Sequence, residues 1–123
     1  MTYKDVFDFL SGITVTTTTT DTIPVAYYAF PEDPSNPAPP PPFMVYYYGG
    51  SDDLYAGNTN YQKVRPLTIE LYTDNKSFDL EERVEDALAG AGLTYSRSET
   101  YIDSEKLYMV AYATEIIVTE VTQ

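Results

Sequence analysis

The sequence predicts an α+β domain with a mainly antiparallel sheet flanked by helices, in the order helix-strand-strand-strand-helix-strand-strand. One observation is helical spacing of apolar residues, near the N-terminus and again over residues 78 to 92. Another is a set of short segments that are rich in β-branched and aromatic residues and are bounded by turn residues. Helices and strands do not alternate regularly along the chain, which is typical of α+β folds.

The length and hydropathy of the chain predict one domain over residues 1 to 123, because chains of this size usually bury a single core. With 43% hydrophobic residues, such a core can form. No apolar run reaches the length of a membrane span, and the N-terminal residues lack the basic and apolar blocks of a signal peptide. We therefore expect a soluble domain that is not secreted and contacts no membrane.

The composition excludes most familiar enzyme chemistry. There is no cysteine and no histidine, so disulfides, thiolate zinc ligands and imidazole general bases are absent. Seven basic residues against 19 acidic ones give a net charge of −12, which repels nucleic acid and anionic lipid. We expect no catalytic residue, no cofactor and no metal site.

The first helix is predicted over residues 3 to 10. Thr2 and Asp5 resemble a capping pair, and Gly12 provides a stop. The threonine-rich residues 14 to 22 that follow favour extended backbone but lack the apolar alternation of a core strand. They are predicted to form an exposed extended connection or an edge strand.

The next two strands are predicted at residues 25 to 30 and 43 to 48. Between them lies FPEDPSNPAPPPP, whose prolines lack the amide donor of a ladder and favour polyproline II. The strands are therefore predicted to form a hairpin with an overlong, stiff connection.

A polar excursion over residues 49 to 61 is predicted to lead into a third strand at residues 64 to 74. Leu67, Ile69 and Leu71 alternate there with polar side chains and with Tyr72. Pro66 is expected at the start of this strand or on an edge, where no ladder bond is lost.

The second helix is predicted over residues 78 to 92. Asp79 with Glu82 forms a candidate capping box, and Gly90 and Gly92 end the helix. Its apolar stripe, expected to lie on the sheet, consists of Leu80, Val84, Ala87, Leu88 and Ala91. Two further strands, at residues 93 to 102 and 107 to 118, are predicted to pair as a hairpin.

Two acidic clusters are candidate sites. Asp52 and Asp53 can in principle bind a hard cation, but their spacing matches no calcium loop, and solvated loop charge is the favoured interpretation. The second cluster lies on a turn and an exposed helix start, where capping is the favoured role over acid/base catalysis. It consists of Asp74, Asp79, Glu81 and Glu82.

The proline tract and the 13 tyrosines indicate contacts with other proteins. A PxxP-type ligand for an aromatic groove is one interpretation of the tract. A stiff, exposed spacer at a subunit boundary is favoured, because core strands are predicted on both sides. Tyrosine suits such boundaries, since its ring packs while its hydroxyl finds a polar partner.

The order of segments resembles a family of phage proteins. A strand before PPFMVYY, a polar loop ending in NTNYQKV, LTIELYTDNKSFDLEERVEDAL and LTYSRSETYIDSEKLYMVAYATEI are similar to the tail terminator (tail completion) group of long-tailed phages and prophages. The similarity covers nearly the whole chain, without a catalytic motif. The threonine run and the lengthened PAPPPP connection depart from the family's pattern.

The resemblance implies a structural protein and no enzyme. Tail terminators form a hexameric ring that caps the tail tube, stops its polymerisation and joins the tail to the neck or head-completion protein. The expected location is the virion tail or neck, and the host cytoplasm during assembly. DNA would pass through the ring without specific binding, because carboxylates in a lumen do not hold phosphates.

Other functions remain open on the sequence: another neck component, such as a stopper or minor capsid protein, a proline-tract adaptor, or a metal-dependent hydrolase. The candidate protein-protein interface residues are Pro37, Pro39, Pro40, Pro41, Pro42, Asp52, Asp53, Tyr55, Tyr61, Asp103 and Glu105.

Overall fold

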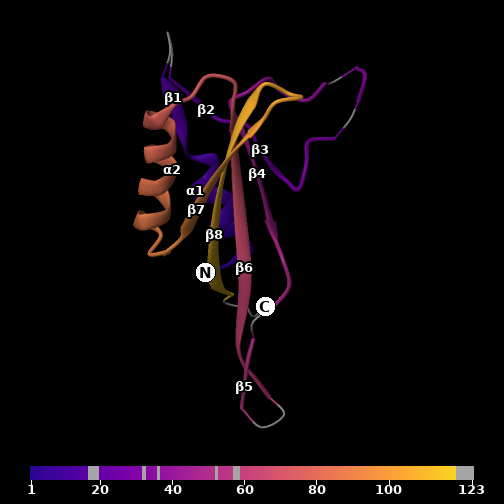
Figure 1. The fold of residues 1–123 in the computed structure, drawn as a ribbon. Coiled ribbons are helices and arrows are strands. Elements are labelled where there is room, and N and C mark those ends of the chain that lie inside the picture. The colour runs from indigo at the N-terminus through magenta and orange to yellow at the C-terminus, as the bar shows by residue number, and fades with distance from the viewer. Residues whose placement is uncertain (17–19, 32, 36, 52, 57–58, 119–123) are drawn as a thin grey trace.

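The computed structural model describes residues 1–16, 20–31, 33–35, 37–51, 53–56 and 59–118 (Figure 1). The α+β class and the order of the main elements agree with the prediction. The helices are α1 (Tyr3–Ser11) and α2 (Phe78–Gly90). The strands are β1 (Thr14–Thr16), β2 (Thr20–Thr22), β3 (Val25–Tyr27), β4 (Phe43–Tyr48), β5 (Leu54–Ala56), β6 (Thr59–Thr73), β7 (Ser96–Ile102) and β8 (Leu107–Val118).

The main sheet has the strand order β3-β4-β6-β8-β7, and β5 pairs with the N-terminal end of β6. The pairs β4/β6, β6/β8 and β7/β8 are antiparallel. The long strand β6 runs the length of the molecule and carries β5 at one end (Figure 1). The β7/β8 pair forms the predicted hairpin, although β7 begins at Ser96, three residues later than expected.

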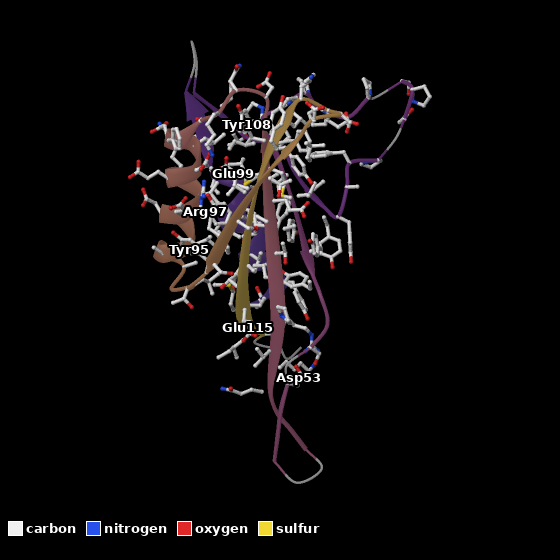
Figure 2. All side chains as sticks on the ribbon, in the orientation of Figure 1. Asp53, Tyr95, Arg97, Glu99, Tyr108 and Glu115 are labelled. Carbon is white, nitrogen blue, oxygen red and sulfur yellow. The ribbon has the colours of Figure 1, made fainter. Side chains whose placement is uncertain are left out.

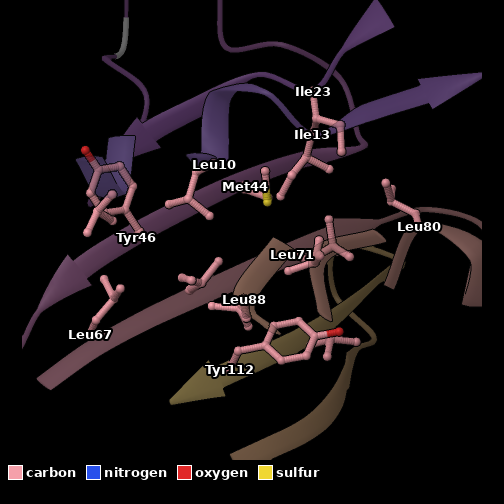
Figure 3. Packing of buried hydrophobic residues seen from close by; sticks show 14 of the residues in the cluster. Leu10, Ile13, Ile23, Met44, Tyr46, Leu67, Leu71, Leu80, Leu88 and Tyr112 are labelled. Carbon is pink, nitrogen blue, oxygen red and sulfur yellow. The ribbon is translucent and has the colours of Figure 1, made fainter. Parts of the chain in front are cut away.

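Both helices pack on one face of this sheet. The alternation of Leu67, Ile69 and Leu71 is confirmed, since all three are almost completely buried. They belong to one cluster with side chains from both helices and from β4 and β8 (Figure 3). The helix residues of this cluster are Val6, Leu10, Leu80, Val84 and Leu88. Burial of such side chains contributes roughly 1.5–3 kcal/mol each relative to exposure.

The prediction that residues 25 to 30 and 43 to 48 form a hairpin is wrong, because β3 and β4 are parallel. Parallel neighbours require a connection that crosses from one end of the sheet to the other, which takes about a dozen residues or more. The long proline-containing connection therefore has a topological reason. β3 is also shorter than predicted, because Tyr28 adopts a positive φ of 69°.

The predicted polar excursion over residues 49 to 61 is also wrong in part. Residues 54 to 56 form β5, and β6 begins at Thr59, five residues before the predicted start. Pro66 therefore lies inside β6 and not at its start. The Pro66 carbonyl accepts from Gly49 N at 3.2 Å and so points toward the β4 side, just beyond the end of β4. The nitrogen of the same residue lies on that side too. The missing N–H of Pro66 therefore removes no hydrogen bond from the ladder between β6 and β8.

The helix starts were predicted with mixed success. The capping box of α1 is confirmed, since the Thr2 hydroxyl accepts from Asp5 N at 3.0 Å and Asp5 Oδ2 accepts from Thr2 N at 2.8 Å. In α2 the N-cap is Ser77, which accepts from Leu80 N, so the box of Asp79 with Glu82 is wrong. Ser77 lies two residues before Asp79, in the extended conformation that a cap requires.

The threonine-rich stretch forms a small antiparallel ribbon, β1 with β2, separate from the main sheet. The prediction of an exposed connection or edge strand is therefore correct only in its extended backbone. Ile13 and Ile23, on either side of the ribbon, are buried and fix it to the core. Thr17 to Thr19 lie outside the described residues.

Candidate assembly surfaces

The proline arm, residues 37 to 42, projects from the sheet between β3 and β4 (Figure 1). Its base is built of aromatic pairs on the sheet face opposite the helices: Phe30 lies edge-on against Phe43 at 5.5 Å between ring centroids, and Phe43 stacks on Tyr72 at 5.0 Å. Pro37, Ala38 and Pro40 are exposed and the other three prolines are half-buried. The predicted exposure is therefore confirmed for part of the arm, and its role as a spacer at a subunit boundary stays a prediction.

The β5/β6 hairpin extends from the opposite end of the sheet (Figure 1). Asp53, at its base, forms an ion pair with Arg65 and accepts a hydrogen bond from Val64 N at 2.9 Å (Figure 2). Only 6% of the Asp53 side chain is exposed, so its interpretation as a solvated loop charge is wrong. The carboxylate thus ties the start of β5 to β6 at the base of the hairpin. The residues next to Asp53 in the sequence do not reveal this role.

Three other candidate residues belong to this hairpin region. Tyr55 lies on β5 and Tyr61 on β6, and the structure describes their backbone but not their side chains. Asp52 lies outside the described residues. Their interface roles stay predictions.

The turn between β7 and β8 carries Asp103 and Glu105, which are both exposed. Lys106 takes a positive φ of 56° there and pairs with Asp103 at 3.5 Å. Tyr72 of β6 pairs with Phe43 of β4 on one side and with Met109 of β8 on the other. The β7/β8 turn and the end of the proline arm therefore lie at the same end of the sheet. The candidate residues are thus divided between two opposite ends of the molecule.

A group of tyrosines at the β3 edge, on the helix-covered face, surrounds a pocket of about 510 Å³. Tyr3 packs edge-on against Tyr48 at 4.9 Å between centroids, and Tyr27 packs edge-on against Tyr46 at 5.3 Å. The Tyr27 hydroxyl accepts a hydrogen bond from Tyr48 N at 3.4 Å. We call this the tyrosine pocket; it is lined by Tyr3, Tyr27, Tyr46, Tyr48, Gly50 and Arg65.

The phenol groups of this pocket converge. Burial, followed by the nearby hydroxyls of Tyr46, Tyr3 and Tyr27, raises the pKa of Tyr48. The Tyr48 hydroxyl oxygen is buried and finds no hydrogen-bond partner among the described residues. Buried polar groups are normally satisfied, so this hydroxyl is an exception among the described residues. Sequence reasoning did not find this pocket, because it joins α1, β3 and β4 across the fold.

A charged cluster closes the opposite, β7 edge against α2. Glu81 is only 3% exposed and pairs with Arg97 and, at 2.5 Å, with Lys76. Glu99 pairs with both cations, and Figure 2 shows Arg97 and Glu99 on β7. The hydrogen bond to Glu81 raises the pKa of Arg97, and Lys76, followed by Arg97, holds the pKa of Glu99 below its usual value.

This cluster corrects the prediction that the acids of α2 lie on an exposed helix start. Glu81 faces the sheet because it follows Leu80 on the buried side, whereas Asp79 and Glu82 are exposed. Tyr112 extends the network by donating to Glu85 at 2.9 Å. The alternation of Arg97 and Glu99 on the predicted strand is the signal that could have identified these partners of Glu81.

The described residues contain no group of three or more acidic side chains positioned to hold a metal ion. None of their helices is long and apolar enough to span a membrane. A further hollow of about 750 Å³ lies over β6, β8 and the start of β7, and its lining includes Val64, Pro66, Ala113 and the 52%-exposed Ile117. Among the described residues, Tyr95 and Glu115 are the ionisable side chains that line it.

Comparison with known proteins finds a likeness to a solved structure. No family model and no curated protein sequence matches the chain. Among solved structures, the chain is similar to a protein chain in the virion of a native gene transfer agent particle, with 15% identity and a TM-score of 0.50. The match covers 76% of this chain and 77% of that chain. At this identity the likeness shows a shared fold.

Proposed function

We propose that this protein is a structural component of a phage-like virion. The observation that carries the proposal is its fold, which it shares over most of its length with a component of a gene transfer agent virion. The surface is consistent with assembly, because it presents an exposed proline arm, a projecting hairpin and an open pocket lined by four tyrosines.

Within that class, we propose the role of tail terminator. Copies would form a ring, the hexamer that the resemblance implies, and this ring would cap the tail tube, stop its growth and join the tail to a neck or head-completion protein. The support is the resemblance of the segment order to that family. The opposite positions of the β5/β6 hairpin and the β7/β8 turn give such a ring two different surfaces, one for each neighbour.

The charge of the chain supports passage of DNA without binding. A net charge of −12 leaves phosphates few cations to contact, so a lumen formed by this protein would not retain DNA by counterion release. Cations of the described network are paired with carboxylates, which reduces their attraction further. The proposed location is the tail or neck of the virion, reached from the host cytoplasm during assembly.

Electron microscopy of particles from a host in which this gene alone is disrupted tests the proposal. A terminator predicts tails of uncontrolled length that are detached from filled heads, with wild-type protein supplied in trans restoring normal particles. Tails of normal length beside leaking heads would instead assign the protein to another neck position. Unaltered virions would contradict a virion role and favour the proline-tract adaptor.

Complementation with variants at each end refines the assignment. Asp103→Ser with Glu105→Ser alters the exposed β7/β8 turn, whereas Asp53→Ser releases the base of the opposite hairpin. If the ends serve different neighbours, one variant fails in length control and the other in head joining. Identical defects from both would argue against two separate surfaces.

A further inference from the structure

The tyrosine pocket has the chemistry of a groove that receives proline-rich chain. Such grooves offer aromatic faces for the pyrrolidine rings and hydroxyl donors for the carbonyl groups. Tyr3 and Tyr27 are 46% and 48% exposed, so their rings are available on the surface. Beneath them lies the buried Tyr48 hydroxyl, which has no partner among the described residues. The pocket surface therefore presents the rings and hydroxyls of Tyr3 and Tyr27 in one place.

The proline arm has the complementary chemistry. Residues 37 to 41, PAPPP, carry no charged side chain and only one backbone N–H, that of Ala38, while every residue keeps its carbonyl acceptor. Prolines are already restricted in φ, so a docked tract loses little conformational entropy. A segment that accepts hydrogen bonds and donates few fits a pocket that has donors to spare.

The arm cannot fill the pocket of its own chain. Phe30 and Phe43 root the arm on the sheet face opposite the helices, whereas Tyr46 and Tyr48 point to the helix-covered face. The arm also leaves the sheet at the Phe43 end of β4 and projects from the end of the sheet opposite β5 (Figure 1). The Tyr48 end of β4 is about 17 Å from Phe43 along the strand. The pocket therefore needs an arm from elsewhere.

The charge of the chain favours a second copy at these two surfaces. Copies that each carry a net charge of −12 repel one another over most of their surface. The PAPPP segment is neutral, and the pocket is lined by four tyrosines, a glycine and Arg65, whose charge is balanced by Asp53. The arm carries no charged side chain, so its contact with the pocket brings no two like charges together.

We propose that the tyrosine pocket of one copy binds residues 37 to 41 of a second copy of this chain. The arm lies across the rings of Tyr3 and Tyr27, whose hydroxyls donate to its carbonyls. The Tyr48 hydroxyl joins them when the exposed Tyr3 ring turns aside. This inference rests on the self-assembly in the proposed function. Because the contact joins two different surfaces, repetition closes into a ring or continues as a filament.

Complementation between two variants tests this contact. The arm variant replaces Pro37, Pro39, Pro40 and Pro41 by serine and keeps its pocket; the pocket variant is Tyr3→Ala and keeps its arm. Sedimentation velocity over a concentration series should show assemblies for the wild type and, for each variant alone, self-association weakened about tenfold or more. Their equimolar mixture should form a heterodimer and nothing larger, since one intact arm and one intact pocket remain.

Tyr101→Ala is the matched control for the pocket variant. Tyr101 is 47% exposed and has one aromatic neighbour, Tyr108, at 4.9 Å, as Tyr3 has Tyr48. It lies on β7, away from the pocket. The proposal predicts wild-type assembly for this control. Equal loss of assembly in Tyr101→Ala and Tyr3→Ala would overturn it, and circular dichroism establishes that both are folded.

A peptide of residues 37 to 42 provides a measurement that does not depend on variant folding. Added to the wild-type protein, it should shift the ring resonances of Tyr3 and Tyr27 in NMR spectra and disperse the assemblies, whereas a peptide with serine at the four substituted positions should do neither. Absence of shifts overturns the docking. If the wild-type protein forms rings but the peptide causes no shifts, the proposed virion role is unaffected. The gene disruption tests that role separately.

Discussion

The two edges of the sheet are closed by different chemistry. At the β7 edge, Glu81 joins α2 to the sheet through Arg97 and Lys76. At the β3 edge, aromatic rings from α1, β3 and β4 meet around an open pocket, and the Tyr48 hydroxyl has no partner among the described residues. Charge therefore holds α2 to the sheet at one edge, whereas at the other edge the aromatic groups line the site of the proposed contact with a second copy.

Buried carboxylates and unsatisfied phenols have opposite energetic consequences. Removing one member of a buried ionic cluster leaves its partners desolvated and unpaired, which is strongly destabilising. Removing a buried hydroxyl that has no partner relieves a desolvation penalty. Substitutions at the two edges should therefore change stability in opposite directions, and the following predictions are ordered by expected size.

The largest effect is expected for Glu81→Ala. It leaves Arg97 and Lys76 without their shared carboxylate, and we expect the free energy of unfolding to fall by about 3 kcal/mol. Urea denaturation followed by circular dichroism measures this. The neighbouring Glu82→Ala, at an exposed position, is the matched control and should change stability by less than about 0.5 kcal/mol. Similar losses in both would mean that the cluster is not what holds α2.

A smaller loss is expected for Tyr112→Phe. The Tyr112 hydroxyl donates to Glu85 at 2.9 Å in the interior, and a bond to a charged acceptor contributes about 1.5 kcal/mol. The midpoint of urea unfolding should shift down with an unchanged slope. Stability equal to that of the wild type would show that water replaces the missing hydroxyl without cost.

The same chemical change at the other edge, Tyr48→Phe, is expected to stabilise the monomer by about 1 kcal/mol. It removes a buried oxygen that has no partner and keeps the ring that packs against Tyr3. Tyr47→Phe is the control, because the Tyr47 hydroxyl donates to Glu70 at 3.2 Å and its loss should not stabilise. A destabilised Tyr48→Phe would indicate a partner that this hydroxyl finds in solution.

The smallest effect concerns pH and Glu99. Its pKa is lowered from an ordinary value of 4.5, mainly by Lys76. A lowered carboxyl pKa in the folded state contributes stability that is present above the unfolded pKa and is lost as the pH falls through the folded pKa. Stability curves of the wild type and Glu99→Gln should thus differ at neutral pH, and the difference should shrink as the pH falls below 4.5. A difference that stays constant as the pH falls would exclude ionisation of Glu99 as its cause.

Local patterns were enough to predict the fold class. The period-two alternation of Leu67, Ile69 and Leu71 fixed the face of β6, and the Thr2 and Asp5 pair fixed the start of α1. The direction of β3 was not predictable, because nothing in the 25 to 30 segment distinguishes a hairpin from a parallel crossover. Its correction follows from the sheet pairing alone.

The candidate surfaces divide in the same way. The proline arm was recognisable, since proline restricts its own backbone whatever lies around it. The tyrosine pocket and the Glu81 cluster were not, because each depends on residues that only folding brings together. Tyr3 and Tyr48, or Glu81 and Arg97, are remote in sequence, and each looks like an ordinary surface residue of its own element.

The most direct test of the division between the edges is to measure unfolding free energy and self-association together for Tyr48→Phe and Tyr112→Phe. The account predicts that Tyr48→Phe unfolds at higher urea concentration than the wild type yet associates more weakly in sedimentation velocity. Tyr112→Phe should unfold at lower urea concentration and, where folded, associate as the wild type does. Two variants that lose stability alike, or that both retain full association, would contradict it.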